Sequence, residues 1–110
     1  MIRTLLSSFV LAMPVAVAAD AIPVLDVEAS CRQVASIAGG QVTSKDRCMA
    51  QEQGAREDLR KQWATFSRAD QQTCLDQTRM GGLPSYVELL ECMVMARDAR
   101  ALEAGKPDGK

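Results

Sequence analysis

The sequence predicts an all-α fold: four helices arranged as two disulfide-stapled helical hairpins after a cleaved signal peptide. Apolar residues recur at spacings of three and four, and no stretch of any length alternates as a strand does. Two glycine pairs each separate two such segments, and each segment carries one of the four cysteines. We expect a signal peptide at 1–19, an extended leader at 20–25, a helical domain at 26–104 and a flexible tail at 105–110.

The composition excludes several classes of function. The chain has 110 residues, a formal net charge of -1 and no histidine. The near-neutral charge argues against a nucleic-acid binder, which carries a basic excess. Without histidine there is no Ser-His or Cys-His catalysis and no zinc site with a histidine ligand. Aromatic residues make up only 4%, so the core must be built mainly from aliphatic side chains and methionine.

The first residues have the layout of a secretory signal peptide. Arg3 precedes an uncharged apolar stretch from Leu5 to Val17, and a small-residue cleavage site follows at Ala16–Ala18. The stretch is shorter than the roughly 20 residues that a membrane-spanning helix needs. We therefore expect a periplasmic or secreted protein without a stable membrane anchor, whose mature chain begins between Ala19 and Ile22.

The first helix is predicted to begin at Asp26 and to end at the glycine pair 39–40, where glycine enters the left-handed conformation at little cost. Its inner face is predicted from spacings of four, three and four, and consists of Val27, Cys31, Val34 and Ala38.

The second helix is the clearest amphipathic segment in the chain. Its apolar stripe consists of Cys48, Ala55, Leu59, Trp63 and Phe66. We expect Trp63 and Phe66 to anchor the core, with a binding surface as the alternative. The opposite face offers two ion pairs at i,i+4, Glu52 with Arg56 and Glu57 with Lys61, which we interpret as a solvated surface.

The third and fourth helices are marked by their starts. Ser67 and Asp70 open a short helix through Cys74 that ends at the glycine pair 81–82. Ser85 and Glu88 form a capping box before a last helix that runs from about Tyr86 to Leu102. This last helix is apolar nearly all round, so we expect other elements to cover it on several sides.

The cysteine positions predict the disulfides Cys31–Cys48 and Cys74–Cys92. Each half of the chain reads helix, glycine pair, capping signal, helix, with one cysteine in each helix. At 1.5 Å per residue along antiparallel helices, the predicted partners differ in height by roughly 3–6 Å. Both other pairing schemes place Cys48 too far from its partner, with a gap of roughly 18 Å to Cys74. The Cα atoms of a disulfide lie only about 4.4–6.8 Å apart.

Redox or metal chemistry at cysteine and methionine is the alternative to a structural role. A thioredoxin-type site uses C-x-x-C, and structural zinc sites use paired cysteines at short spacing; the chain has neither. Met93 and Met95 follow Cys92 closely in the sequence, but residues two apart on a helix point about 200° apart. They therefore cannot chelate one ion, and we interpret them as core residues.

Two stretches resemble those of a known family. They are Cys48-x3-Glu52-x2-Ala55-Arg56-x2-Leu59-x3-Trp63-x2-Phe66 and Pro84-Ser85-Tyr86-Val87-Glu88-Leu89-Leu90-x-Cys92. Together they resemble a family of small exported four-cysteine helical proteins of unknown function from Gram-negative bacteria. The likeness runs from about Val24 to Arg100 and implies an exported helical fold with no activity assigned. A weaker likeness, to lysozyme-inhibitor domains of the LprI type, rests on the order Leu59, Trp63, Phe66 and Cys74.

From these observations we expect a non-catalytic binding or interaction module of the cell envelope. We expect a protein partner, and neither a cofactor nor a metal nor a nucleic acid. One alternative is a periplasmic inhibitor of a cell-wall-degrading enzyme. The other is a redox or metal-carrier protein that uses its cysteine and methionine side chains.

Overall fold

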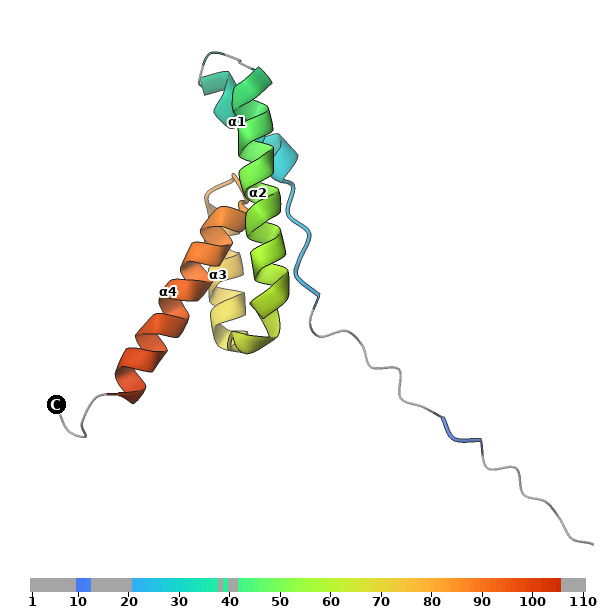
Figure 1. Ribbon diagram of the computed structural model, residues 1–110, viewed down its shortest axis with the longest axis vertical. Helices are drawn as coiled ribbons and strands as arrows, with labels where there is room; N and C mark the ends of the chain where they lie inside the picture. Colours follow the sequence, from blue (N-terminus) through green and yellow to red (C-terminus); the bar gives the residue numbers. More distant parts are fainter. Residues whose placement is uncertain (1–9, 13–20, 38, 40–41, 106–110) are drawn as a thin grey trace, which may run out of the picture.

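The computed structural model describes residues 10–12, 21–37, 39 and 42–105, with the backbone alone at 42 and 43. These residues form an all-helical fold with two disulfides (Figure 1). Most of the predicted signal peptide lies outside the described residues, as do Ala38 and Gly40 and residues 106–110 of the predicted tail. Within the described ranges, no helix combines the length and the hydropathy that crossing a membrane requires.

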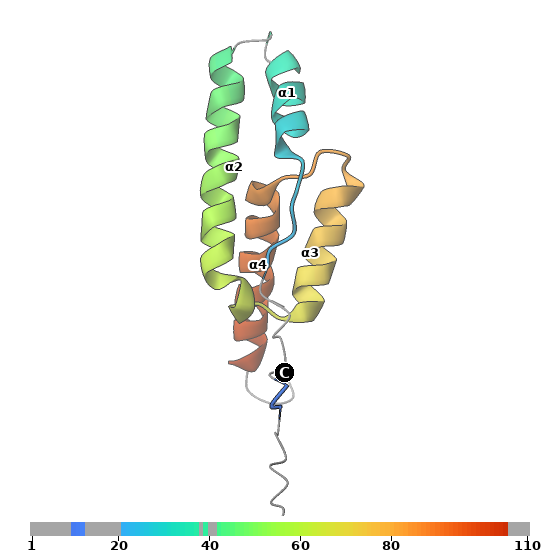
Figure 2. The ribbon, with the colours of Figure 1, turned by 90° about the vertical axis from the view of Figure 1, so that its right-hand side faces the viewer.

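The helices form two hairpins, and one long helix of the first hairpin also packs against the second. Helix α1 (Val27–Ile37) packs against α2 (Val42–Gln62), and α3 (Arg68–Met80) packs against α4 (Tyr86–Ala104). One 3-10 turn, η1 (Trp63–Thr65), follows α2. Helix α2 contacts α1 along one half of its length and α4 along the other (Figures 1 and 2). The two hairpins are therefore joined mainly through α2 and α4.

The hydrophobic core lies where α2, η1, α3 and α4 meet. Its buried members are Leu25, Val27, Ala55, Leu59, Trp63, Phe66, Cys74, Tyr86, Leu89 and Met93. Trp63 and Phe66 are buried, as expected of core anchors, although α2 ends at Gln62 and Trp63 begins the 3-10 turn. The tighter turn redirects the chain and lets both aromatic side chains face the same core.

The extended leader contributes to this core as well. Leu25 is buried, and its backbone N–H donates to the Tyr86 hydroxyl at 2.9 Å. The same hydroxyl donates to the Pro23 carbonyl at 3.1 Å. The segment thus follows the helices as an extended strap that α4 holds in place (Figure 2).

The predicted starts of α3 and α4 are confirmed. The Ser67 hydroxyl accepts from the Asp70 N–H at 3.1 Å, and the Ser85 hydroxyl accepts from the Glu88 N–H at 3.2 Å. Each satisfies a helix N–H that has no partner within its own helix. Gly82, with φ of +73°, supplies the left-handed residue before α4.

Two expectations about helix faces are wrong. Val34 is 45% exposed, and Ala35 and Ser30 are buried in its place. Helix α1 continues beyond the start of α4 (Figure 1), and Val34 lines an open recess rather than the core. Helix α4 is likewise not covered on all sides, and the interpretation of Met95 as a core residue is wrong. Met95 is 70% exposed although Met93 is fully buried, because residues two apart point to opposite sides of a helix, and Leu102 near the end of α4 is also 70% exposed.

Replacing Trp63 with alanine tests the assignment of the core. Trp63→Ala removes a large side chain that is only 4% exposed, so we expect the free energy of unfolding to fall by about 3–5 kcal/mol. The matched control is Met95→Ala, which removes an exposed side chain and leaves stability nearly unchanged. Urea unfolding of both variants provides the measurement, and equal midpoints would contradict the assignment.

Candidate functional site

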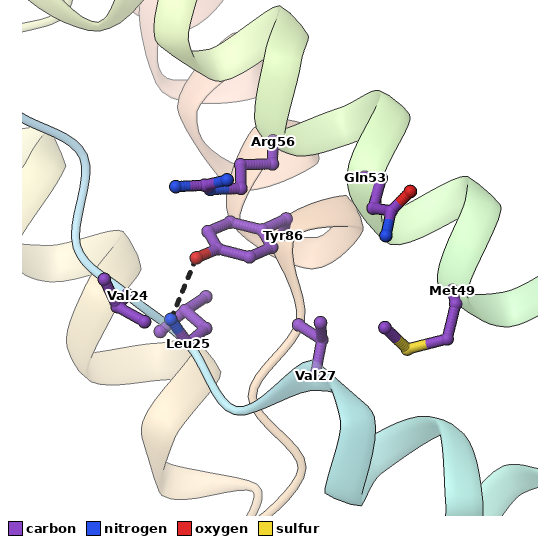
Figure 3. A pocket seen from close by; sticks show the side chains of 7 residues that line it. All are labelled: Val24, Leu25, Val27, Met49, Gln53, Arg56 and Tyr86. Carbon is purple, nitrogen blue, oxygen red and sulfur yellow. Dashed lines mark hydrogen bonds between the residues drawn. The ribbon is translucent and has the colours of Figure 1, made fainter.

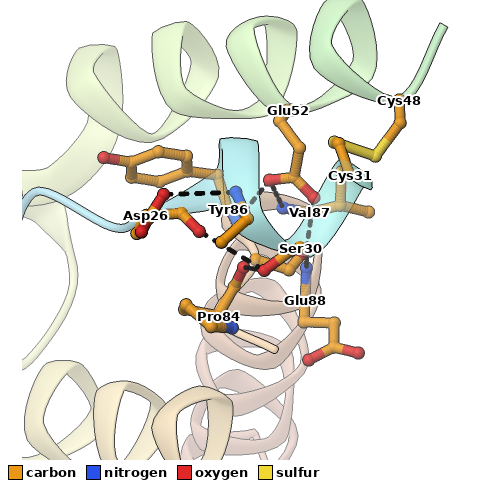
Figure 4. Close-up of a disulfide and its surroundings, with 11 residues drawn as sticks. Asp26, Ser30, Cys31, Cys48, Glu52, Pro84, Tyr86, Val87 and Glu88 are labelled. Atoms are coloured by element: carbon orange, nitrogen blue, oxygen red, sulfur yellow. Dashed lines mark hydrogen bonds between the residues drawn. A yellow bond between two sulfur atoms is a disulfide. The ribbon is translucent and has the colours of Figure 1, made fainter. Parts of the chain in front are cut away.

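The carboxylate of Glu52 caps the N-terminus of α4 from a different helix. Its oxygens accept from the Ser85 hydroxyl at 2.6 Å and from the backbone N–H of Tyr86 at 2.6 Å, with a longer contact to the Val87 N–H at 3.4 Å (Figure 4). Glu52 is only 6% exposed. A negative charge is stabilised at this end of a helix by the free N–H groups and by the helix dipole. The contact therefore fixes α2 to the start of α4.

Neighbouring hydroxyl groups complete the hydrogen bonding around this contact. The Ser85 N–H donates to the Thr78 hydroxyl at 3.0 Å, which takes the place of the reciprocal Glu88 bond of a capping box. The Ser30 hydroxyl of α1 donates to the Pro84 carbonyl at 2.8 Å. Thr78 and Ser30 are both buried. Elements α1, α2, α3 and α4 thus all meet at the segment that precedes α4.

A recess of about 430 Å³ opens beside the Glu52 contact, and we call it the notch. Helix α1 supplies Val34, α4 supplies Val87, and α2 supplies Cys48 along its floor. The remaining lining residues are Ser44, Arg47, Gln51, Glu52, Ser85 and Glu88. The notch exists because α1 and the first half of α2 extend past the beginning of α4 (Figure 1).

The lining of the notch combines two valines with polar and charged side chains. Val34 is 45% exposed there, and Ile37, one turn further along α1, is 81% exposed. Arg47 and Glu88 also line it, and neither forms an ion pair within 4.0 Å in the described part of the chain. A segment bound in the notch would meet the two valines together with one positive and one negative group.

Both disulfides have the predicted pairing and stabilise the two hairpins. Cys31–Cys48 joins α1 to α2 and Cys74–Cys92 joins α3 to α4, each with a Cα–Cα distance of 5.6 Å. The first of them borders the notch (Figure 4). Cys31 and Cys74 are buried at 0% and 2% exposure, which limits the access of an external thiolate. Disulfides of this kind form and persist in oxidising compartments.

Two acidic residues at the surface, Glu57 and Asp70, are held in ion pairs by arginine. Arg60 forms two hydrogen bonds with Glu57, at 2.6 and 3.0 Å, and they lower the pKa of that carboxyl. The predicted pair of Glu57 with Lys61 is therefore replaced by a pair at i,i+3. Hydrogen bonds from Arg100 likewise lower the pKa of Asp70. Lowered pKa values keep these carboxylates ionised, the opposite of what a general acid requires.

The role of Glu52 is the main feature that the sequence interpretation missed. The predicted ion pair of Glu52 with Arg56 on a solvated face is wrong, because Glu52 points inward to α4. A signal was present: Glu52 lies three residues before Ala55 and seven before Leu59, on the same buried stripe. An acid on a core stripe needs a buried partner, and a helix N-terminus is a suitable one.

No metal site is found among the described residues, where no three Cys, Asp or Glu side chains are close enough to hold an ion. Comparison of the chain with family models, curated proteins and solved structures finds no match.

Glu52→Gln tests the helix cap. The amide keeps the shape of the side chain but loses the charge that the start of α4 stabilises. We expect the free energy of unfolding to fall by about 1.5–3 kcal/mol, as for hydrogen bonds to a charged group. Glu57→Gln, on the exposed face of the same helix, serves as the control and should lower the free energy of unfolding by less than Glu52→Gln does. Urea unfolding measures both, and equal losses would show that the buried carboxylate is not the stabilising contact.

Proposed function

We propose that the protein is an exported binding module of the cell envelope that recognises a protein partner through the notch. The observation that carries the proposal is a recess, lined by two valines among polar and charged side chains, whose walls are fixed before binding. One wall is held by the Cys31–Cys48 disulfide and the other by the Glu52 cap. A preformed surface loses little conformational entropy when a partner binds, so more of the contact energy becomes affinity.

The character of the notch suggests what the partner presents. The valines that line the notch, Val34 and Val87, favour an apolar side chain from the partner. Arg47 and Glu88, which also line the notch, favour an acidic and a basic residue in the same segment of the partner. We therefore propose that the partner inserts a short segment that contains one apolar residue and residues of both charges.

The other expected functions have less support. The burial of Cys31 and Cys74 favours structural disulfides over a redox cycle. Inhibition of a cell-wall-degrading enzyme would be a special case of the proposal, with that enzyme as the bound partner. Residence in the periplasm or outside the cell rests on the predicted signal peptide, and the two disulfides are consistent with it.

Val34→Glu tests the notch as the binding surface. The oxidised protein, its Val34→Glu variant and its Met80→Glu variant are each immobilised and exposed to a periplasmic extract. Val34 and Met80 are both exposed, so both variants keep the fold, and they introduce the same charge at different places. We expect a discrete protein to be captured by the parent protein and by Met80→Glu.

Capture of that protein by Val34→Glu should fall at least about tenfold, because a carboxylate replaces an apolar contact at the centre of the interface. A photo-cross-linker at Val34 should label the same protein, whereas one at Gln72 on α3 should not. Equal capture by the two glutamate variants would contradict the proposal.

A further inference from the structure

A second pocket lies on a different face of α2 from the notch. It has a volume of about 260 Å³ and is formed by the leader, by α2 and by the start of α4 (Figure 3). Met49, Gln53 and Arg56 line it at i, i+4 and i+7, a spacing that places them on one face of α2. Val24 and Val27 line the opposite side, and the Tyr86 ring lies between the α2 side and the leader side of the pocket.

Arg56 is the charged group of this pocket, and no carboxylate of the described residues forms a hydrogen bond or a close ion pair with it. Its guanidinium carbon lies 6.0 Å from the centroid of the Tyr86 ring. Within the described residues, it forms neither a hydrogen bond nor an ion pair within 4.0 Å. The adjacent acid, Glu57, is held by Arg60 at 2.6 Å. The donors of Arg56 therefore remain free for a ligand beside an apolar wall.

Contacts of two of its own lining residues, Leu25 and Tyr86, hold one side of the pocket in place. The Tyr86 hydroxyl is engaged by the Leu25 N–H and the Pro23 carbonyl, so the leader stays in place beside α2. Leu25 itself is buried at 6% exposure, which anchors the segment that carries Val24 and Val27. A ligand would thus enter a site that is largely formed before it binds, as small-molecule sites usually are.

We propose that this pocket binds an organic carboxylate with a short apolar body. The carboxylate would accept two hydrogen bonds from the planar fork of Arg56, a geometry that guanidinium groups favour. The apolar body would lie against Met49 and Val27, which face each other across the pocket (Figure 3). A cation would be repelled by Arg56, and a doubly charged phosphate would find too few donors among these apolar walls.

The volume limits the size of the ligand. At about 260 Å³ the pocket is slightly smaller than the roughly 300 Å³ at which sites for drug-sized molecules begin. A short free carboxylic acid fits this limit, and so does the C-terminal residue of a peptide. Both present the same chemistry, and the experiment below distinguishes them. The inference is independent of the notch and of the partner proposed there.

The test is an NMR titration of the oxidised protein with hexanoate and with a short peptide that ends in leucine. Hexanamide and the C-terminally amidated peptide are the neutral controls. We expect saturable shifts at the Gln53 side-chain amide and in the Tyr86 ring, with a dissociation constant on the order of 1 mM or tighter for at least one carboxylate. Its neutral analogue should bind at least about tenfold more weakly. Binding of hexanoate identifies free acids as ligands, and binding of the peptide alone identifies a chain terminus.

Variants of α2 separate the site from general charge effects. Arg56→Gln should weaken carboxylate binding at least about tenfold, and Arg56→Lys less, because an ammonium group lacks the bidentate fork. Lys61→Gln removes the same charge outside the pocket and should leave the affinity unchanged, as should Val34→Glu in the notch. Arg56 is exposed, so its variants are expected to fold. Absence of saturation by either carboxylate up to about 10 mM, or equal affinities for the parent and Arg56→Gln, would overturn the proposal.

Discussion

The arrangement of the two hairpins depends on one buried carboxylate. Each hairpin is closed by its own disulfide, but no disulfide joins one hairpin to the other. Glu52 supplies the buried charged link between them, because it accepts hydrogen bonds from Ser85 and from the first backbone N–H of α4. A buried charge is costly unless it is hydrogen-bonded, so only one placement of α4 against α2 satisfies this side chain. The same requirement fixes the positions of both candidate binding sites.

The two recesses border this contact on different faces of α2. The notch includes Glu52 itself, together with Val34 and Val87. The Arg56 pocket includes Tyr86, whose N–H donates to Glu52 and whose hydroxyl holds the leader. A change in the placement of α4 would therefore alter both sites at once. We infer that the scaffold serves to hold a small number of side chains in fixed positions.

Local features of the sequence were sufficient to predict the architecture. Helical periodicity predicted the four helices, and the Ser67 and Ser85 signals predicted the starts of α3 and α4. Comparing the positions of the cysteines along antiparallel helices predicted both disulfides, because each disulfide joins two helices that follow one another in the chain. Such features depend on residues close in sequence, which is why a single sequence contains them.

The candidate sites depend on contacts between distant residues, and there the sequence was less informative. Glu52 was assigned to the surface because Arg56 lies at i+4, yet its true partner is 34 residues away at Tyr86. Val34 was assigned to the core because its spacing from Val27 and Cys31 is that of one helix face. The structure instead leaves it 45% exposed in the notch, where α1 extends past the start of α4. In both cases the local spacing correctly indicated a helix. Whether the side chain is buried or exposed was decided by the position of α4, which the local spacing does not contain.

Amide hydrogen exchange at Tyr86 tests the central role of Glu52 most directly. The first N–H of a helix has no partner within its own helix and normally exchanges fast. Arg68, the first residue of α3, provides the internal reference, because its N–H donates no hydrogen bond to any of the described residues. We predict that the Tyr86 N–H exchanges far more slowly than the Arg68 N–H in the oxidised protein, and that Glu52→Gln reduces this difference. Equally fast exchange at the two positions would contradict the account.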